Sequence, residues 1–183
     1  MGQKRLKLFL ILALSLANQG STGFPHKTKP TAQSWQYFFK MGERGQRQLW
    51  QKKWQQGIGL GDWSWQWRLG WVRACSESIS RHCLDILAEA TSDKALVVRA
   101  EAARAIGTRF RGTENTKAVK ILASIYRNPS NLRKKKPLFV QKSVLRALWQ
   151  IKGPTSQQMG KQLASSSRVT KRYWQKLNAS KLN

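Results

Sequence analysis

The chain contains few acidic residues and few residues that could bind a metal ion. Among its 183 residues there are 8 Asp and Glu, two Cys and two His. Eight carboxylates are too few for a calcium cage or a carboxylate-rich magnesium site. A closed zinc site would need every Cys and His, and their spacing does not fit one. The sequence therefore predicts no metal and no cofactor.

Catalytic motifs are absent as well. The sequence has no Ser/His/Asp set, no glycine-rich phosphate-binding loop and no His-Glu-x-x-His pattern. Gly57, Gly59 and Gly61 form an isolated glycine cluster that specifies no site. His82 beside Cys83 suggests a Cys–His nucleophile, but neighbours on a helix point about 100° apart. We therefore predict no catalytic residues and a protein that is not an enzyme.

The few acids are outnumbered by bases. The chain has 34 Lys and Arg, which gives a formal net charge of +26. The last acid is Glu114, and residues 115–183 contain 16 Lys and Arg without one carboxylate. Such a surface attracts anions, although a solvated basic surface that only keeps the protein soluble is the alternative. Apolar residues make up 40% of the chain, which is enough for a packed core and argues against disorder.

The N-terminal segment is typical of a secretory signal. Three cations precede the apolar stretch at residues 8–17, which is too short to span a bilayer. Ser15 and Ala17 are small residues that suit cleavage after Ala17. We therefore expect a signal peptide at 1–17, a flexible linker rich in Gly, Pro, Ser and Thr at 18–34, and a bacterial protein that is periplasmic or secreted.

An internal repeat extends over residues 67–177. Three nine-residue segments, beginning at Trp67, Val98 and Val140, share apolar residues at positions 1, 5, 6 and 9 and Arg-Ala at positions 7 and 8. A fourth segment, from Val169, keeps only the apolar positions. This spacing places the apolar residues on one face of a helix and does not fit a strand. We predict an all-α protein with helices near 64–76, 79–91, 96–107, 116–128, 138–151 and 155–164.

A single pair of such helices cannot bury its apolar stripe, whereas stacked pairs can, which predicts a short α-solenoid. The segments resemble HEAT-like repeats, particularly the short bacterial form. The resemblance is strongest over residues 84–110, where an Asp-containing turn precedes Val-Arg and the run Ala-Ala-x-Ala-Ile-Gly. It implies stacked antiparallel helix pairs over residues 63–177, in which Arg99, and less clearly Arg68, bonds a turn. The repeat places four residues in the buried stripe: Ala103, Ile106, Leu145 and Leu148.

Position 7 of the three complete copies is always arginine: Arg73, Arg104 and Arg146. A ladder of equivalent arginines could contact successive phosphates of a polymer. It could equally cover apolar surface with its methylene groups. The apolar positions on either side favour the structural role.

Seven of the nine Trp lie between Trp35 and Trp71, mostly in a Trp-rich N-terminal segment at 35–62 and at the start of the repeats. These rings could form the core and cap of the first repeat, stack on bases or sugars, or lie at an anionic membrane interface. Trp63 and Trp65 lie off the apolar stripe. We therefore expect these two to contact a ligand.

Cys75 ends one repeat helix and Cys83 lies in the next. Across a helix–turn–helix the two side chains could face each other, and export favours a disulfide. Two buried free thiols are an equally good interpretation.

The strongest basic signals lie in an insert at residues 128–137 and in the last repeat helix. Inserted loops of solenoids map to one face and often bind partners. We therefore predict a polyanion-binding site. Its residues are Arg133, Lys134, Lys135 and Lys136 of the insert and Arg168, Lys171 and Arg172 of the last helix, ahead of a basic tail at 178–183.

The resulting interpretation is an exported, non-enzymatic binding or scaffold protein. Its partner would be an anionic envelope polymer, an acidic protein or nucleic acid, with a membrane surface also considered and no small-molecule substrate. A protein of another class is the alternative. Some alkylpurine DNA glycosylases are built from HEAT-like repeats and use Trp with an Asp, which Asp62 beside Trp63, Trp65 and Trp67 superficially matches.

Overall fold

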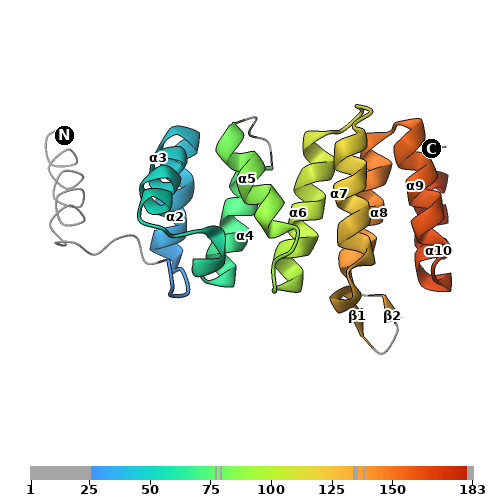
Figure 1. Cartoon of the computed structure of the whole chain (residues 1–183), viewed down its shortest axis with the longest axis horizontal. Helices are drawn as coiled ribbons and strands as arrows, with labels where there is room; N and C mark the ends of the chain where they lie inside the picture. The colour runs from blue at the N-terminus through green and yellow to red at the C-terminus, as the bar shows by residue number, and fades with distance from the viewer. Residues whose placement is uncertain (1–25, 77, 79, 134–135, 138, 181–183) are drawn as a thin grey trace, which may run out of the picture.

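The fold is helical, as predicted, over the residues that the computed structural model describes, which are 26–76, 78, 80–133, 136–137 and 139–180. The helices are α2 (Ala32–Lys40), α3 (Gly42–Gln55), α4 (Trp65–Ala74), α5 (Arg81–Ala90), α6 (Leu96–Arg109), α7 (Thr116–Arg127), α8 (Phe139–Ile151), α9 (Pro154–Ala164) and α10 (Arg168–Ala179). They lie side by side in a row along the longest axis, with α2 and α3 near one end and α10 at the other (Figure 1).

Three short elements complete the chain. They are the 3-10 turns η1 (Leu60–Asp62) and η2 (Pro129–Asn131), and a hairpin of β1 (Leu132–Arg133) and β2 (Lys136–Pro137). The hairpin extends beyond the ends of α7 and α8 (Figure 1). The expected signal peptide, Lys134, Lys135 and the last three residues of the basic tail lie outside the described residues.

The helix bounds follow the apolar pattern to within a few residues. One difference is in α6, because the sequence placed a turn from Gly107 onward and the helix continues to Arg109. A Cβ at Gly107 would lie 2.6 Å from the Cα of Ala147 in α8. The glycine therefore allows two helices to approach closely, and the chain turns later, at Gly112, where φ is +73°.

The prediction of a flexible linker at 18–34 is wrong from residue 26 onward. The backbone N–H of Ser64 donates to the His26 carbonyl at 2.7 Å, and the Ser64 hydroxyl donates to the Thr28 carbonyl at 3.1 Å. The His26 ring also packs edge-on against Trp63. Helix α2 then begins with Thr31 as its N-cap. Polar composition alone did not reveal that this segment lies against the start of α4.

Two hydrophobic clusters form the core, and α6 contributes to both. The N-terminal core is rich in aromatic rings: Phe38, Trp50, Trp63, Trp67 and Trp71. The C-terminal core is mostly aliphatic and includes the stripe residues Leu145 and Leu148, with Val119, Leu122 and Val144. From α6, Val98, Ala102 and Ala105 face the first core, and Ala100, Ala103 and Ile106 face the second.

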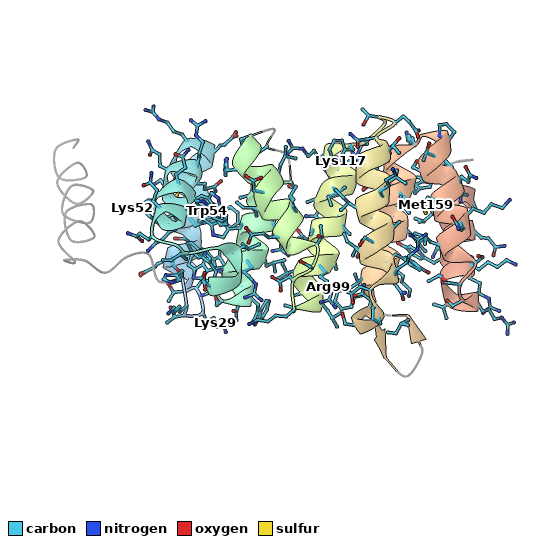
Figure 2. All side chains as sticks on the ribbon, viewed as in Figure 1. Lys29, Lys52, Trp54, Arg99, Lys117 and Met159 are labelled. Atoms are coloured by element: carbon cyan, nitrogen blue, oxygen red, sulfur yellow. A yellow bond between two sulfur atoms is a disulfide. The ribbon has the colours of Figure 1, made fainter. Side chains whose placement is uncertain are left out.

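Buried arginines connect neighbouring turns. Arg68 of α4 forms a two-pronged ion pair with Asp93, including an Nη2–Oδ1 distance of 2.9 Å. Arg99 of α6 donates to the Asp93 carbonyl, to Asn131 Oδ1 at 3.0 Å and to Ser130 Oγ at 2.9 Å (Figure 2). Both arginines are 3% exposed, so their guanidinium groups hold turns in place and are not available to a ligand. Burial lowers the pKa of Arg99.

Candidate anion-binding surface

Most acidic side chains in the described part of the chain are engaged in internal hydrogen bonds. Of the eight acids, Glu77 is not described, which leaves seven, and six of these accept hydrogen bonds from the protein. They are Glu43 (from Ser78), Asp62 (Gly59), Glu89 (Leu60), Asp93 (Arg68), Glu101 (Arg73 and Arg104) and Glu114 (Thr155). Few carboxylates therefore remain to neutralise the basic surface.

The basic side chains that follow Glu114 are all at the surface wherever their side chains are described. Eleven of the 16 are described, and every one is exposed: Lys117, Lys120, Arg127, Lys142, Arg146, Lys152, Lys161, Arg168, Lys171, Arg172 and Lys176. The ion pairs found within the described residues are Arg68–Asp93, Arg73–Glu101 and Arg104–Glu101. None of the eleven takes part, so this half of the molecule carries uncompensated positive charge.

The position-7 arginines lie at the same register on three adjacent helices. Helix α6 packs against both α4 and α8, and helices in such contact lie about 8–10 Å apart. The side chains of Arg73 and Arg104 are 56% and 52% exposed, and Arg146 is exposed as well. The three arginines are therefore exposed at equivalent positions of neighbouring helices, and we call this set the arginine stripe.

One carboxylate interrupts the arginine stripe. Glu101 accepts from Arg73 Nε at 3.2 Å and from Arg104 Nε at 3.0 Å. Burial by itself raises the pKa of Glu101, but the hydrogen bonds and charges of the two arginines outweigh it, so the pKa is lowered. Arg146 pairs with no carboxylate among the described residues. The positive potential of the stripe therefore increases toward α8.

The charge continues from α8 onto α10. Lys142, one turn before Arg146, places its Nζ 5.9 Å from the centre of the Tyr173 ring. The predicted polyanion residues Arg168, Lys171 and Arg172 are exposed on α10. For the insert, the structure shows only that the backbones of Arg133 and Lys136 are paired across the hairpin. It does not place the side chains of the four insert cations relative to α10.

The Trp-rich block is mostly core, and the prediction of a ligand contact at Trp63 is wrong. Trp63 is 1% exposed and packs edge-to-face against Trp67 and Trp71. It follows the irregular turn η1, so helical periodicity did not apply to it. Trp65 is exposed, at 45%. Trp54 (Figure 2) is 56% exposed, although the sequence did not predict it as a ligand contact.

The residues of the glycosylase-like arrangement are divided between core and surface. The Asp62 carboxylate accepts the Gly59 N–H at 2.8 Å, which caps η1. Trp63 and Trp67 beside it are buried, whereas Trp65 is exposed. We do not propose that activity for this protein.

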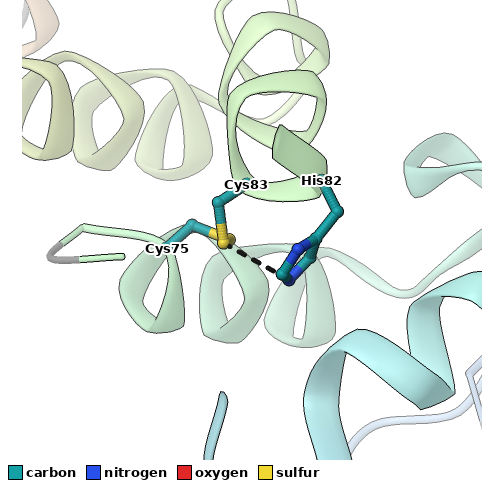
Figure 3. A group of neighbouring side chains, drawn as sticks. All are labelled: Cys75, His82 and Cys83. Carbon is teal, nitrogen blue, oxygen red and sulfur yellow. Dashed lines mark hydrogen bonds between the residues drawn. A yellow bond between two sulfur atoms is a disulfide. The ribbon is translucent and has the colours of Figure 1, made fainter. Parts of the chain in front are cut away.

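Cys75 and Cys83 are joined by a disulfide that links the end of α4 to the start of α5 (Figure 3). His82 Nε2 lies 3.5 Å from Cys83 Sγ, and burial lowers the pKa of His82. Within the described residues, the possible ligand atoms of Cys75, His82 and Cys83 lie within 4.8 Å of one another, which is close enough to hold a metal ion. Metal ligation needs thiolates, however, and here both sulfurs are oxidised and at most 2% exposed. The disulfide therefore serves as a covalent link.

Two cavities open in the basic half. The larger, of about 520 Å³, lies between α9 and α10 and is lined by Lys161, Ala164, Ser165, Lys171, Trp174, Gln175 and Asn178. A shallower one of about 500 Å³ lies at the end of α7, lined by Lys120, Ser124, Arg127, Asn128 and Pro129. No carboxylate lines either cavity. Sequence periodicity could not reveal them, because each depends on how neighbouring segments meet.

Comparisons of the chain with family models, with curated proteins and with solved structures find no match. Within the described residues, no helix has the length and apolar character needed to cross a membrane. The chemistry of the surface is therefore the basis on which we infer a function.

Proposed function

We propose that this chain is an exported, non-enzymatic HEAT-like binding protein whose C-terminal half engages an anionic polymer or an acidic protein in the cell envelope. One observation carries the proposal. From residue 115 onward every described basic side chain is exposed, none is in an ion pair, and the sequence contains no acid.

The architectural part of the proposal is a short α-solenoid. It is supported by the row of helices, by the equal register of α4, α6 and α8, and by the ties from Arg68 and Arg99 to the turns that follow them. Repeats that contact mainly their neighbours form extended surfaces on which equivalent residues line up. Export is supported by the apolar N-terminal stretch and by the disulfide.

Solubility alone does not account for this distribution of charge. A net charge of about 2–8 is sufficient to keep a small domain soluble, and this chain carries +26. Like charges on one surface repel one another and oppose the compact state. A polyanionic partner would neutralise them, and the counterions it releases would favour binding.

Two variants with equal loss of charge test whether the C-terminal half carries the affinity. The first replaces Lys142, Arg146 and Arg172 with Ser. The matched control replaces Arg44, Arg47 and Lys52, which are exposed on α3. Binding of fluorescent dextran sulfate is measured over a range of NaCl concentrations. If the three C-terminal cations contact the polymer, the slope of log K against log salt should flatten by about 2–2.7, at 0.7–0.9 per contact.

The control variant should keep nearly the wild-type slope. Equal slopes for the two variants would show that only total charge matters, and the proposal would fail. Circular dichroism spectra should match for all three proteins, because surface substitutions usually change stability by less than about 0.5 kcal/mol each.

Substitutions that make the protein more positive test the arginine stripe itself. Glu101→Gln removes its carboxylate, and Asp85→Asn removes an exposed carboxylate on α5 with the same change in net charge. If the stripe contacts the polymer, Glu101→Gln should raise affinity more than Asp85→Asn does. Identical gains would remove the stripe from the binding surface.

A further inference from the structure

The cleft between α9 and α10 has the size and charge of a site for one unit of a charged polymer. Its volume of about 520 Å³ lies within the range of small-ligand sites, about 300–1,000 Å³. Lys161 of α9 and Lys171 of α10 line it from two sides. Both are exposed and neither is in an ion pair, so both ammonium groups are available to an anion.

The floor of the cleft is a Trp174 ring held in a fixed position. A Cβ at Gly160 would lie 2.1 Å from Trp174 Cη2, so the six-membered ring rests directly on the α9 backbone. Trp174 is 8% exposed. Its indole N–H makes no hydrogen bond within the described residues and is not sealed from solvent. The ring therefore offers apolar surface to the cleft.

The remaining lining supplies hydrogen-bond acceptors. The Asn178 side-chain N–H donates to the Trp174 carbonyl at 3.0 Å, which leaves its Oδ1 as a free acceptor. The Ser165 hydroxyl donates to the Gln162 carbonyl at 2.6 Å, which leaves its oxygen lone pairs. Gln175 adds an amide with both functions. A carboxylate or phosphate has only acceptor atoms, so these acceptors suit a ligand that also carries hydroxyl groups.

We propose that this cleft binds one residue of an acidic polysaccharide, with its carboxylate on Lys161 and Lys171 and its hydroxyl groups on Ser165, Gln175 and Asn178. The inference rests on the proposed function and names the class of its polymer.

Other anionic ligands fit the cleft less well. Nucleic-acid bases need an open aromatic face on which to stack, and Trp174 is almost covered.

The test follows the Trp174 indole N–H by NMR in the full, ¹⁵N-labelled protein, with Trp174→Phe used to assign its resonance. We expect a tetramer of galacturonate to shift this resonance in a saturable way. A tetramer of galactose, which keeps the ring and hydroxyl groups but has no carboxylate, should leave it in place. Inorganic phosphate and a short single-stranded oligonucleotide should also leave it in place.

Matched variants assign the contacts. Lys161→Ser with Lys171→Ser should weaken galacturonate binding at least about 10-fold, because hydrogen bonds to charged groups contribute strongly. Arg44→Ser with Lys52→Ser on α3 removes the same charge and should leave the affinity within about twofold, since it touches no contact in the cleft.

The inference is overturned if galacturonate leaves the Trp174 resonance unmoved, or if galactose, phosphate or the oligonucleotide shifts it as strongly. It is also overturned if the two double variants lose affinity equally. In any of these cases the dextran sulfate slopes still report separately on the proposed function.

Discussion

The two halves of the molecule are built by different means. The N-terminal half has an aromatic core, a disulfide and all eight acids, which mostly hold turns and helix starts in place. The C-terminal half has an aliphatic core closed by tight helix contacts, no cysteine and no acid after Glu114. Among the described residues that follow Glu114, no side chain takes part in an ion pair. The cations of this half are therefore free to serve another purpose.

Helix α6 contributes to both cores, so substitutions in it test whether the two halves unfold as one unit. These substitutions should have the largest effect on stability. Ala102 faces the N-terminal core and Ala103 the C-terminal core, and both are 0% exposed. Either Ala→Asp change buries an unpaired carboxylate, which should cost more than about 3 kcal/mol. We expect each variant to lose structure in both halves, as seen by far-ultraviolet circular dichroism and tryptophan fluorescence in parallel.

Arg104→Ala, on the exposed face of α6, serves as the control and should cost no more than about 1 kcal/mol, because it removes only a half-exposed ion pair with Glu101. If Ala103→Asp left the fluorescence of the N-terminal tryptophans native while helicity fell, the halves would be independent units.

Removal of the disulfide, which lies in the N-terminal half, should have the next largest effect on stability. The sequence separation of Cys75 and Cys83 is 8 residues, and closing a loop of this size is worth about 2–3 kcal/mol. Cys75→Ala with Cys83→Ala should lower the free energy of unfolding in urea by that amount. Reductant should destabilise the wild type comparably and leave the double variant unchanged. A wild-type midpoint that ignores reductant would contradict this.

One packing arrangement occurs in both halves, in which a Trp ring packs directly against a helical glycine. A Cβ at Gly70 would lie 2.2 Å from Trp35, and one at Gly160 would lie 2.1 Å from Trp174. Gly70→Ala and Gly160→Ala should each destabilise the protein by about 1–3 kcal/mol through overpacking. Gly61→Ala is the matched control, because a Cβ there meets nothing within 4 Å. Equal melting temperatures for all three variants would mean that the rings move aside freely.

The smallest effect concerns pH. Because the pKa of Glu101 is lowered in the folded protein, its stabilisation is present above the unfolded pKa of about 4.3 and is lost as pH falls through the folded pKa. Glu101→Gln should cost about 0.2–1 kcal/mol at pH 7, since its arginine partners are half exposed. The difference from wild type should shrink as pH falls well below 4.3 and Glu101 becomes protonated in the folded protein. When Arg73 and Arg104 are both Gln, Glu101→Gln should have little effect at either pH.

The sequence predicted the repeat helices well because their 3.6-residue apolar period is regular from Trp67 onward. It missed α2, because this helix buries Phe38 and shows no repeated apolar spacing like that of the later helices. It misplaced Trp63, since burial there depends on a turn and on contacts with His26. The equal register of Arg73, Arg104 and Arg146 was identified, but the sequence favoured a structural role for them, whereas all three side chains are exposed. The α9–α10 cleft was not identified, because it depends on the position of Trp174 over Gly160.

The arginine ties between turns also bear on how the chain folds. The Arg68–Asp93 and Arg99–Asn131 bonds join residues only 25 and 32 positions apart. Contacts of such short range keep the entropy of loop closure low, and chains rich in them fold fast. A row held together by neighbours also opens from its ends. Amide hydrogens should therefore exchange slowest in α6, which has packed helices on both sides, and fastest in α2 and α10.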